Sequence, residues 1–557
     1  MKKYVIAGIL ILTNVLSLVS CGGNKPAQEN GDNDTTKFFH EKVEPKKTHL
    51  GKENFVYVED YKFKLNGEVF YPIMLNYVVD LRDIESKAVI SPARYYENPD
   101  QYEYDTEAET YAQIGRHFKL IREMGFNSIR LVFDRMITDA ETGEHKYQNT
   151  SKMAFTMDEQ VDEIVASLEK VVAIAKENDI YVMPLLAPCM GDEFIETFTK
   201  LTLNAFSDEP YVFAYDFMNE PLYTDYKKFR PKNEAVSITR QWRQMMNEYA
   251  PNQLFTVGSS EPLEVFEWDP SLIDVDFIQI HTYHPLRIQN EIFWYSKYVN
   301  RPWMIGETSL PADDDSISYE EQRQFVKETY KYAYDCGCMG FGFWEFQDNP
   351  TAPNYEGMYT GIMNHTGTTE LDDGSCIIGS IKPAAKEIKN ISQNKRRIVI
   401  IPPVNYKNMV GLYNIKIHGW VYDHATNTPL EGAVFRAWTD DWSVGINTYT
   451  NEKGEFTLYS NDIVTHFECS ACGMSNFCMT TKLNYMPATE EKYDIYNLPE
   501  KWLNYHCRSY SDLLNKQDSL TENSTNYIYN FDKNKFNQFK FSAELGIFVL
   551  EKMPICE

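Results

Sequence analysis

Apolar runs recur through the middle of the chain, and most of them are apolar at consecutive positions instead of at alternate ones. A strand that is buried on both faces gives this pattern, as the strands of a parallel sheet do. Between several runs lie longer segments whose apolar residues recur every three or four positions, which is the helical period. The eight runs cover residues 70–78, 127–133, 180–186, 212–218, 253–258, 275–281, 302–307 and 339–346.

The helical period is clearest in four segments, at 110–125, 157–178, 237–250 and 318–337. Most of the helical segments close with Gly, Asn or Pro, which are typical of helix ends. Eight strands that alternate with helices predict an α/β protein with a parallel (β/α)8 TIM barrel.

Segments outside this alternation complete the predicted barrel. A hairpin with its turn at Asn66-Gly67 comes before the first strand, where it would close the bottom of the barrel. We expect two long loops, at about 80–109 and 347–380, on the face where active sites of such barrels lie.

A second domain is expected from Met409 to the end of the chain. Its sequence alternates apolar and polar residues with turn signals at short spacing, which predicts an antiparallel β-sandwich. The stretches "TPLEGA" and "TNEKGEFTL" resemble turns of the carboxypeptidase-regulatory-like, transthyretin-like fold. No catalytic constellation stands out in it, so its role could be to stabilise, to space or to bind sugar.

The first twenty residues have the features of an export signal, with Lys2 and Lys3 before a short apolar core. The core ends in "LVSC", which resembles the lipobox of bacterial lipoproteins and would make Cys21 the lipidated N-terminus. The alternative is a plain secretory signal that happens to contain a cysteine. The sequence predicts a signal peptide at 1–20, a flexible tether at 21–52 and an outer-membrane lipoprotein, on the periplasmic or cell-surface side.

Composition narrows the function classes. The net charge of −27 argues against nucleic acid as a partner, because a polyanion would be repelled.

Cys336 and Cys338 are expected to be small buried residues, because two residues apart in a strand they point the same way and cannot easily pair. The late stretch "CSACGMSNFC" has a C-x-x-C pair without a second pair at the usual spacing, which favours disulfides or buried thiols over a metal.

Polar side chains follow or end several predicted strands, which is where the functional groups of such a barrel collect. A carboxylate at the end of a buried strand is costly unless something uses it. Two glutamates on different strands of one barrel face can converge on a single bond, and glycoside cleavage requires two carboxyl groups. The candidates are Arg130, Asn219, Glu220, His281, Tyr283, Glu307 and Trp344.

Four of these stretches resemble motifs of clan A glycoside hydrolases, particularly family five: "YDFMNEP", "MIGETS", "HTYHP" and "NSIRLVF". The resemblance spans about 55–392, within a barrel domain expected at 53–395. It implies that Glu220 is the general acid/base and Glu307 the nucleophile. The third predicted strand, "VMPLLAPCM", lacks a histidine that this family often carries there.

The same resemblance gives roles to the other candidates. It implies that Asn219 binds the 2-hydroxyl of the sugar, that Arg130 and Tyr283 hold Glu307 ionised, that His281 lines the reactive subsite and that Trp344 forms its floor.

We therefore expect a monomeric, retaining β-glycoside hydrolase that needs no metal or other cofactor. Its substrate would be a β-linked polysaccharide or oligosaccharide of the mannan or glucan kind. One alternative is an exo-acting β-glycosidase on short oligosaccharides. The other is a non-hydrolytic glycan-binding lipoprotein on a barrel scaffold, and the presence of both glutamates speaks against it.

Overall fold

The structure is a computed structural model. It describes residues 53–99, 104–133, 136–138, 145–147, 161–186, 193–283, 285, 287–352, 354–391, 415–441, 445–460, 463–483, 486–487 and 541–553. The expected signal peptide, Cys21, the tether and the domain boundary at 395–409 lie outside these residues. No helix in the described ranges is long and apolar enough to cross a membrane.

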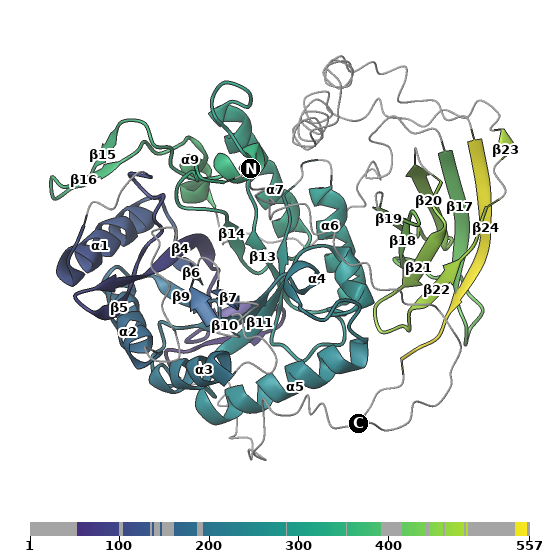
Figure 1. Cartoon of the computed structure of the whole chain (residues 1–557), viewed down its shortest axis with the longest axis horizontal. Coiled ribbons are helices and arrows are strands. Elements are labelled where there is room, and N and C mark those ends of the chain that lie inside the picture. The colour runs from purple at the N-terminus through teal and green to yellow at the C-terminus, as the bar shows by residue number, and fades with distance from the viewer. Residues whose placement is uncertain are drawn as a thin grey trace, which may run out of the picture.

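Eight parallel strands form the barrel, as predicted (Figure 1). They follow one another in the order β10-β11-β12-β13-β14-β4-β6-β9, and bridges Val182–Val212 and Leu185–Asp216 join β9 back to β10. The strands are β4 (Ile73–Ile84), β6 (Ser128–Phe133), β9 (Tyr181–Pro184), β10 (Ala214–Asn219), β11 (Leu254–Ser259), β12 (Ile278–His281), β13 (Trp303–Glu307) and β14 (Phe341–Phe343).

Helices surround the barrel, and the four that the period predicts are present as α1, α2, α5 and α7. Thr106 and Ser318 each form a capping box, which fixes the first residue of α1 and of α7. The longer helices are α1 (Glu107–Glu123), α2 (Val161–Glu177), α3 (Glu193–Ala205), α5 (Lys232–Tyr249), α6 (Ile288–Trp294) with the π-helix η4 (Tyr295–Val299), α7 (Tyr319–Asp335) and α9 (Ala384–Asn390). Short helices α4 (Pro221–Thr224), η3 (Pro262–Phe266) and α8 (Tyr355–Met358) lie in loops that follow strands.

The predicted hairpin closes the amino-terminal end of the barrel. It comprises β1 (Val56–Glu59), β2 (Lys62–Leu65) and β3 (Glu68–Val69), and its turn residues Asn66 and Gly67 have φ values of 51° and 87°. The buried ring of Phe63 packs edge-on against Phe213 and Phe277, which directly precede β10 and β12.

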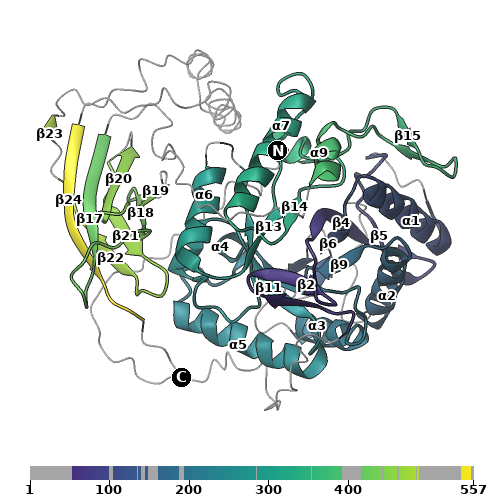
Figure 2. The same ribbon diagram turned by 180° about the vertical axis from the view of Figure 1, so that it is seen from behind.

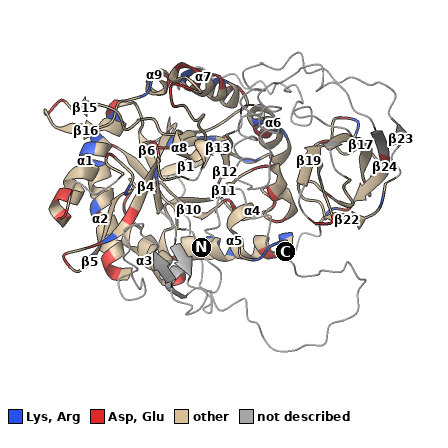
Figure 3. Cartoon of the chain, turned by 45° about the horizontal axis from the view of Figure 1, so that its top comes forward, with Lys and Arg blue, Asp and Glu red and all other residues tan. Residues whose placement is uncertain are grey.

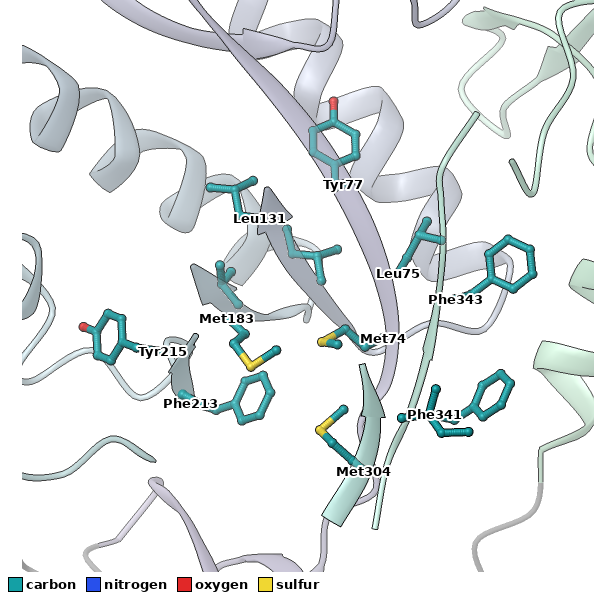
Figure 4. Close-up of a cluster of buried hydrophobic side chains, with 14 of the residues drawn as sticks. Met74, Leu75, Tyr77, Leu131, Met183, Phe213, Tyr215, Met304, Phe341 and Phe343 are labelled. Atoms are coloured by element: carbon teal, nitrogen blue, oxygen red, sulfur yellow. The ribbon is translucent and has the colours of Figure 1, made fainter. Parts of the chain in front are cut away.

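Inside the barrel an apolar layer lies above this hairpin. Met74, Met183, Phe213 and Met304 come from different strands or their beginnings and point toward one another (Figure 4). Polar side chains replace them toward the carboxyl ends of the strands, so the apolar layer forms the base of the site described below.

Two segments expected to be loops contain strands instead. β4 continues to Ile84 and pairs with the antiparallel β5 (Lys87–Pro92) through a turn at Glu85-Ser86, whose φ values are 55° and 64°. Because neither turn residue is Gly or Asn, the usual hairpin signal is missing from the sequence. Segment 347–380 contains α8 and the pair β15 (Thr368–Glu370) and β16 (Cys376–Ile378). Another small hairpin pairs β7 (Met136–Thr138) with β8 (His145–Tyr147).

Cys336 and Cys338 follow α7 and are 3% and 0% exposed, which confirms the prediction that both are buried.

The carboxyl-terminal domain consists of two four-stranded sheets, as predicted for a sandwich. Phe435 and Phe456 stack between them with ring centroids 4.0 Å apart. The pairing is antiparallel except that β17 and β24 run parallel. One sheet has the order β20 (Glu455–Ser460), β17 (Ile415–Asp423), β24 (Phe541–Leu550) and β23 (Met486–Pro487), and the other has β19 (Gly445–Tyr449), β18 (Val434–Trp438), β21 (His466–Ser470) and β22 (Phe477–Thr480).

The sandwich packs against the side of the barrel that carries α6 (Figures 1 and 2). Lys232 of α5 is 4% exposed, and its ammonium group donates to Asp269 at 2.8 Å and to the carbonyls of Ala471 and Met474 at 3.1 and 2.7 Å. The indole of Trp294 donates to the Gly432 carbonyl at 2.9 Å. A buried ammonium group whose acceptors come from both domains ties the two together.

Candidate active site

Arg130 lies at the centre of the polar layer, with its guanidinium fully buried. Its Nε donates to Asp216 at 2.8 Å, its Nη2 to Asn219 at 2.8 Å, and its Nη1 to Asn76 at 3.1 Å and to Glu307. The planar fork of a guanidinium holds several acceptors in a fixed geometry. Arg130 thereby fixes side chains from β4, β10 and β13 relative to one another.

Glu307 ends β13 and is 5% exposed. One of its carboxyl oxygens accepts from Arg130 and the other accepts from the hydroxyl of Tyr283. Burial, with the Glu307 carboxylate next in importance, raises the pKa of Tyr283 well above its usual range, so this hydroxyl stays a proton donor. Donors on both oxygens are the environment of a carboxylate held in one orientation.

Glu220 directly follows β10 in a left-handed conformation, with φ 45° and ψ 69°. Its N–H donates to the Gly258 carbonyl at 2.7 Å, which turns the chain out of the strand. The side chain is 22% exposed, in contrast to the 7% of the Glu307 side chain. Burial raises the pKa of Glu220 to about 7, the Arg130 charge opposes this, and the Glu261 carboxylate adds to it.

His281 ends β12 and lies between the two glutamates. Its Nδ1 is 2.9 Å from a carboxyl oxygen of Glu220 and 3.5 Å from one of Glu307. Burial lowers the pKa of His281 to about 4, so the ring is neutral at pH 7 and one nitrogen must accept.

Gln279 determines which nitrogen of His281 accepts. Its amide nitrogen lies 2.8 Å from Asp216, an acceptor, and 3.1 Å from Nε2 of His281. The amide therefore donates to Nε2, and Nδ1 carries the hydrogen that points to Glu220. Gly258 and Gly306 make room for these groups, since a Cβ at either would lie within 3 Å of the His281 or the Gln279 side chain.

The carboxyl groups of Glu220 and Glu307 come close together. One oxygen of each, with one ring nitrogen of His281, all lie within 4.8 Å of one another. In the described part of the chain this is the one cluster of three such groups with the spacing of metal ligands. Both oxygens of Glu307 already accept hydrogen bonds from protein groups, and the nearby Arg130 charge opposes a cation.

The remaining candidates lie beside this pair. Asn219 uses its side-chain carbonyl oxygen to accept from Arg130, which holds its amide group in one orientation. Trp344 directly follows β14, is half-buried, and donates its backbone N–H to the carbonyl of Thr308 at 3.0 Å. Its peptide bond to Glu345 is cis. Hydrogen bonds thus connect Arg130, Asn219, Tyr283 and Glu307, and another joins His281 to Glu220. Trp344 adjoins this group through Thr308, the residue after Glu307.

Three residues of the site were not anticipated. Asp216 is an acidic residue within the apolar run "VFAYDFM", and that interruption is a signal that could have been used. Gln279 sits two residues before His281 in β12 and so points to the same face of the strand. Glu261 follows β11 and accepts from the Tyr223 hydroxyl at 2.7 Å, but nothing in "SSEP" distinguishes it from a surface turn.

An eight-stranded barrel with two facing glutamates at the carboxyl ends of its strands is the arrangement of barrel glycoside hydrolases. Residues 100–346 match the family model described as cellulase (glycosyl hydrolase family 5), and this match identifies the barrel as a glycoside hydrolase domain. No curated protein matches the chain.

Three solved structures have a partial structural similarity to this chain. An exo-beta-1,4-mannosidase from Opitutaceae bacterium strain TAV5 has a TM-score of 0.44 and 14% identity, over 60% of this chain and 61% of the other. A GH2 beta-galacturonidase from Eisenbergiella tayi, bound to galacturonate, has a TM-score of 0.39 and 14% identity, over 60% and 53%. A beta-glucuronidase from Ruminococcus gnavus, in complex with D-glucuronic acid, has a TM-score of 0.39 and 15% identity, over 60% of this chain and 51% of the other. The chain therefore spans 51–61% of the length of these proteins.

Proposed function

We propose that this protein is a retaining β-glycoside hydrolase in which Glu307 is the nucleophile and Glu220 the general acid/base. The observation that carries the proposal is the approach of their carboxyl oxygens to within 4.8 Å. Retaining enzymes place the two carboxyl groups about 5–5.5 Å apart, whereas inverting enzymes leave about 6.5–9.5 Å for a water.

The environments of the two glutamates suit different tasks. Both oxygens of Glu307 accept hydrogen bonds, which hold its carboxyl group in one orientation for attack on the anomeric carbon. Glu220, with its pKa raised to about 7, still carries a proton in about half of the molecules at pH 7 and can deliver it to the departing glycosidic oxygen. Because one Glu220 oxygen accepts from Nδ1–H of His281, the acidic proton rests on the other oxygen.

In the first step the Glu307 carboxylate forms a bond to the anomeric carbon, the glycosidic C–O bond breaks, and Glu220 protonates the leaving oxygen. In the second step Glu220, now a carboxylate, takes a proton from water. The water oxygen bonds to the anomeric carbon and Glu307 is released, so the configuration is retained after two inversions. The Asn219 amide nitrogen would donate to the sugar 2-hydroxyl, and the Trp344 ring would pack against the apolar face of the sugar.

A β-linked polysaccharide or oligosaccharide of the mannan or glucan kind is the proposed substrate, and the enzyme would act as a monomer anchored to the outer membrane through lipid on Cys21. The match to the family five model supports the chemical class of the substrate.

Proton NMR of the first product formed from an aryl β-glycoside tests the mechanism. We expect the β-anomer to appear before mutarotation. Azide should react with the Glu307→Ala variant to give a glycosyl azide of inverted configuration, and with the Glu220→Ala variant to give one of retained configuration. An α-anomer from the wild type would contradict the retaining mechanism, and reversed azide products would exchange the two roles.

A further inference from the structure

Three exposed aromatic residues follow Glu220 at intervals of three. Tyr223, Tyr226 and Phe229 are 45%, 62% and 55% exposed, and they lie in α4 and the loop that continues it. Single exposed aromatics are common, but three on one short segment form a patch that requires an explanation.

The backbone beneath these rings is held rigidly. Arg230 is 4% exposed and Asp225 2% exposed, and they form a two-pronged ion pair at 2.6 and 2.8 Å. Asp225 also accepts from the indole of Trp268 at 2.8 Å. Phe229 has φ 56°, a left-handed conformation that is unusual for a bulky residue and is found disproportionately at functional sites. The loop thus presents its aromatic rings on a fixed base.

This segment begins at the acid catalyst and leads toward the sandwich. The Tyr223 hydroxyl donates to Glu261, whose charge acts on Glu220, so the first ring adjoins the site. At the other end the guanidinium of Arg436, on β18, lies 5.6 Å from the centre of the Phe229 ring. Figures 1 and 2 both show α4 on the side of the barrel that faces the sandwich.

We propose that Tyr223, Tyr226 and Phe229 form an aromatic strip that binds the leaving-group sugar units of a β-glycan chain. This inference rests on the proposed function. A chain that crosses the site lies with its cleaved oxygen at Glu220, and the strip starts on the Glu220 side of the pair, away from Glu307. Sugar units beyond the cleaved bond are therefore the ones that reach these rings.

The chemistry of the strip fits a neutral glycan. Aromatic rings pack against the apolar C–H faces of pyranose rings without a need for charge. The cations around the strip are engaged: Lys227 pairs with Glu234 at 2.5 Å, and Lys228 donates to the Tyr223 carbonyl at 3.0 Å. Arg436 pairs with Glu468 at 2.6 Å. Figure 3 shows Lys and Arg interspersed with Asp and Glu along the described chain, and the pairings above engage the charges of Lys227, Lys228 and Arg436.

The test compares two substrates in the full-length chain. An aryl β-glycoside has one sugar and no leaving-group sugars, whereas mannohexaose and cellohexaose extend past the cleaved bond. The Tyr226→Ala and Phe229→Ala variants should each lower kcat/KM on the hexasaccharide that wild type cleaves by about 3- to 10-fold, mostly through KM. Activity on the aryl glycoside should stay within about twofold. Tyr61→Ala is the matched control, because Tyr61 is 50% exposed on the hairpin at the opposite end of the barrel.

Unchanged hexasaccharide kinetics in both variants would overturn the strip, as would an equal loss on both substrates, which would indicate a disturbed site. A wild type that cleaves neither substrate would contradict the proposed function instead. In that case the strip is judged by calorimetric binding of both hexasaccharides to the Glu307→Ala chain, with and without Phe229→Ala. A loss of affinity of about 3- to 10-fold supports it, and equal affinity or no binding refutes it.

Discussion

Replacing Glu220 by Gln tests the environment of the acid catalyst without any substrate. A carboxyl group whose pKa is raised by folding holds its proton more tightly in the folded state than in the unfolded state. It therefore reduces stability progressively as pH rises from the unfolded pKa to the folded pKa. For Glu220 that window runs from the ordinary 4.5 to about 7. Gln has almost the same shape and does not titrate, so the variant escapes this loss.

The size of the effect follows from the two pKa values. A rise from 4.5 to about 7 reduces the free energy of unfolding by about 0.8 kcal/mol at pH 5 and by about 3.3 kcal/mol at pH 8, a difference of about 2.5 kcal/mol. Because the side chain is 22% exposed, water screens part of this effect, so about 2.5 kcal/mol is the upper bound for the difference between the two pH values. Other buried carboxyl groups, such as Glu264, are present in both proteins and cancel in the comparison.

The assay is guanidinium unfolding of wild type and the Glu220→Gln variant at pH 5 and at pH 8, followed by tryptophan fluorescence. We expect the variant to gain stability relative to wild type between pH 5 and pH 8 by 1 to about 2.5 kcal/mol. Glu68→Gln, on the exposed strand β3, is the control and should show no such gain. A relative gain that is the same at both pH values, or larger at pH 5, would refute a raised pKa at Glu220.

Further measurements test other parts of the structure. The value of kcat/KM should fall above about pH 7, where Glu220 loses its proton. Glu261→Gln should move this fall to lower pH, because the Glu261 charge raises the pKa of Glu220. An unchanged pH profile would show that Glu261 does not act on Glu220. A chain that ends at Ile391 should be less soluble and melt at a lower temperature than the full chain, because the partners of buried Lys232 are removed; an equally stable, active product would show that the sandwich is dispensable. Cys21→Ala should release the protein from membranes without loss of activity, and an unchanged membrane fraction would refute lipid anchoring. EDTA should leave activity intact, and inactivation that zinc or calcium reverses would show a metal requirement.

The order of the barrel strands could be predicted from sequence because each strand is apolar on both faces and each ends near a polar residue. The antiparallel β5 could not, since its turn at Glu85-Ser86 lacks the residues that usually mark a hairpin. The parallel pairing of β17 with β24 joins residues more than a hundred positions apart, and alternation within a strand does not specify its partner.

The site divides in the same way. Glu220 and Glu307 could be predicted from the sequence because each lies at the end of a buried strand, where a carboxyl group is costly without a use. The hydrogen-bond order Asp216–Gln279–His281–Glu220 depends on three strands lying side by side and on glycines that leave space between them. Two of the three acceptors of Lys232 are backbone carbonyls about 240 positions away, and carbonyl groups leave no trace in the sequence.

The contact of Lys232 with Asp269, Ala471 and Met474 constrains how this protein can be recombined. A chimaera that joins the barrel to a foreign sandwich leaves an ammonium group at the seam, where the new partner must offer two carbonyls in the same place. A barrel from a relative that carries an apolar residue at this position would in turn leave those carbonyls without a hydrogen-bond donor. A functional graft therefore has to place its junctions outside both domains, so that Lys232 keeps its acceptors.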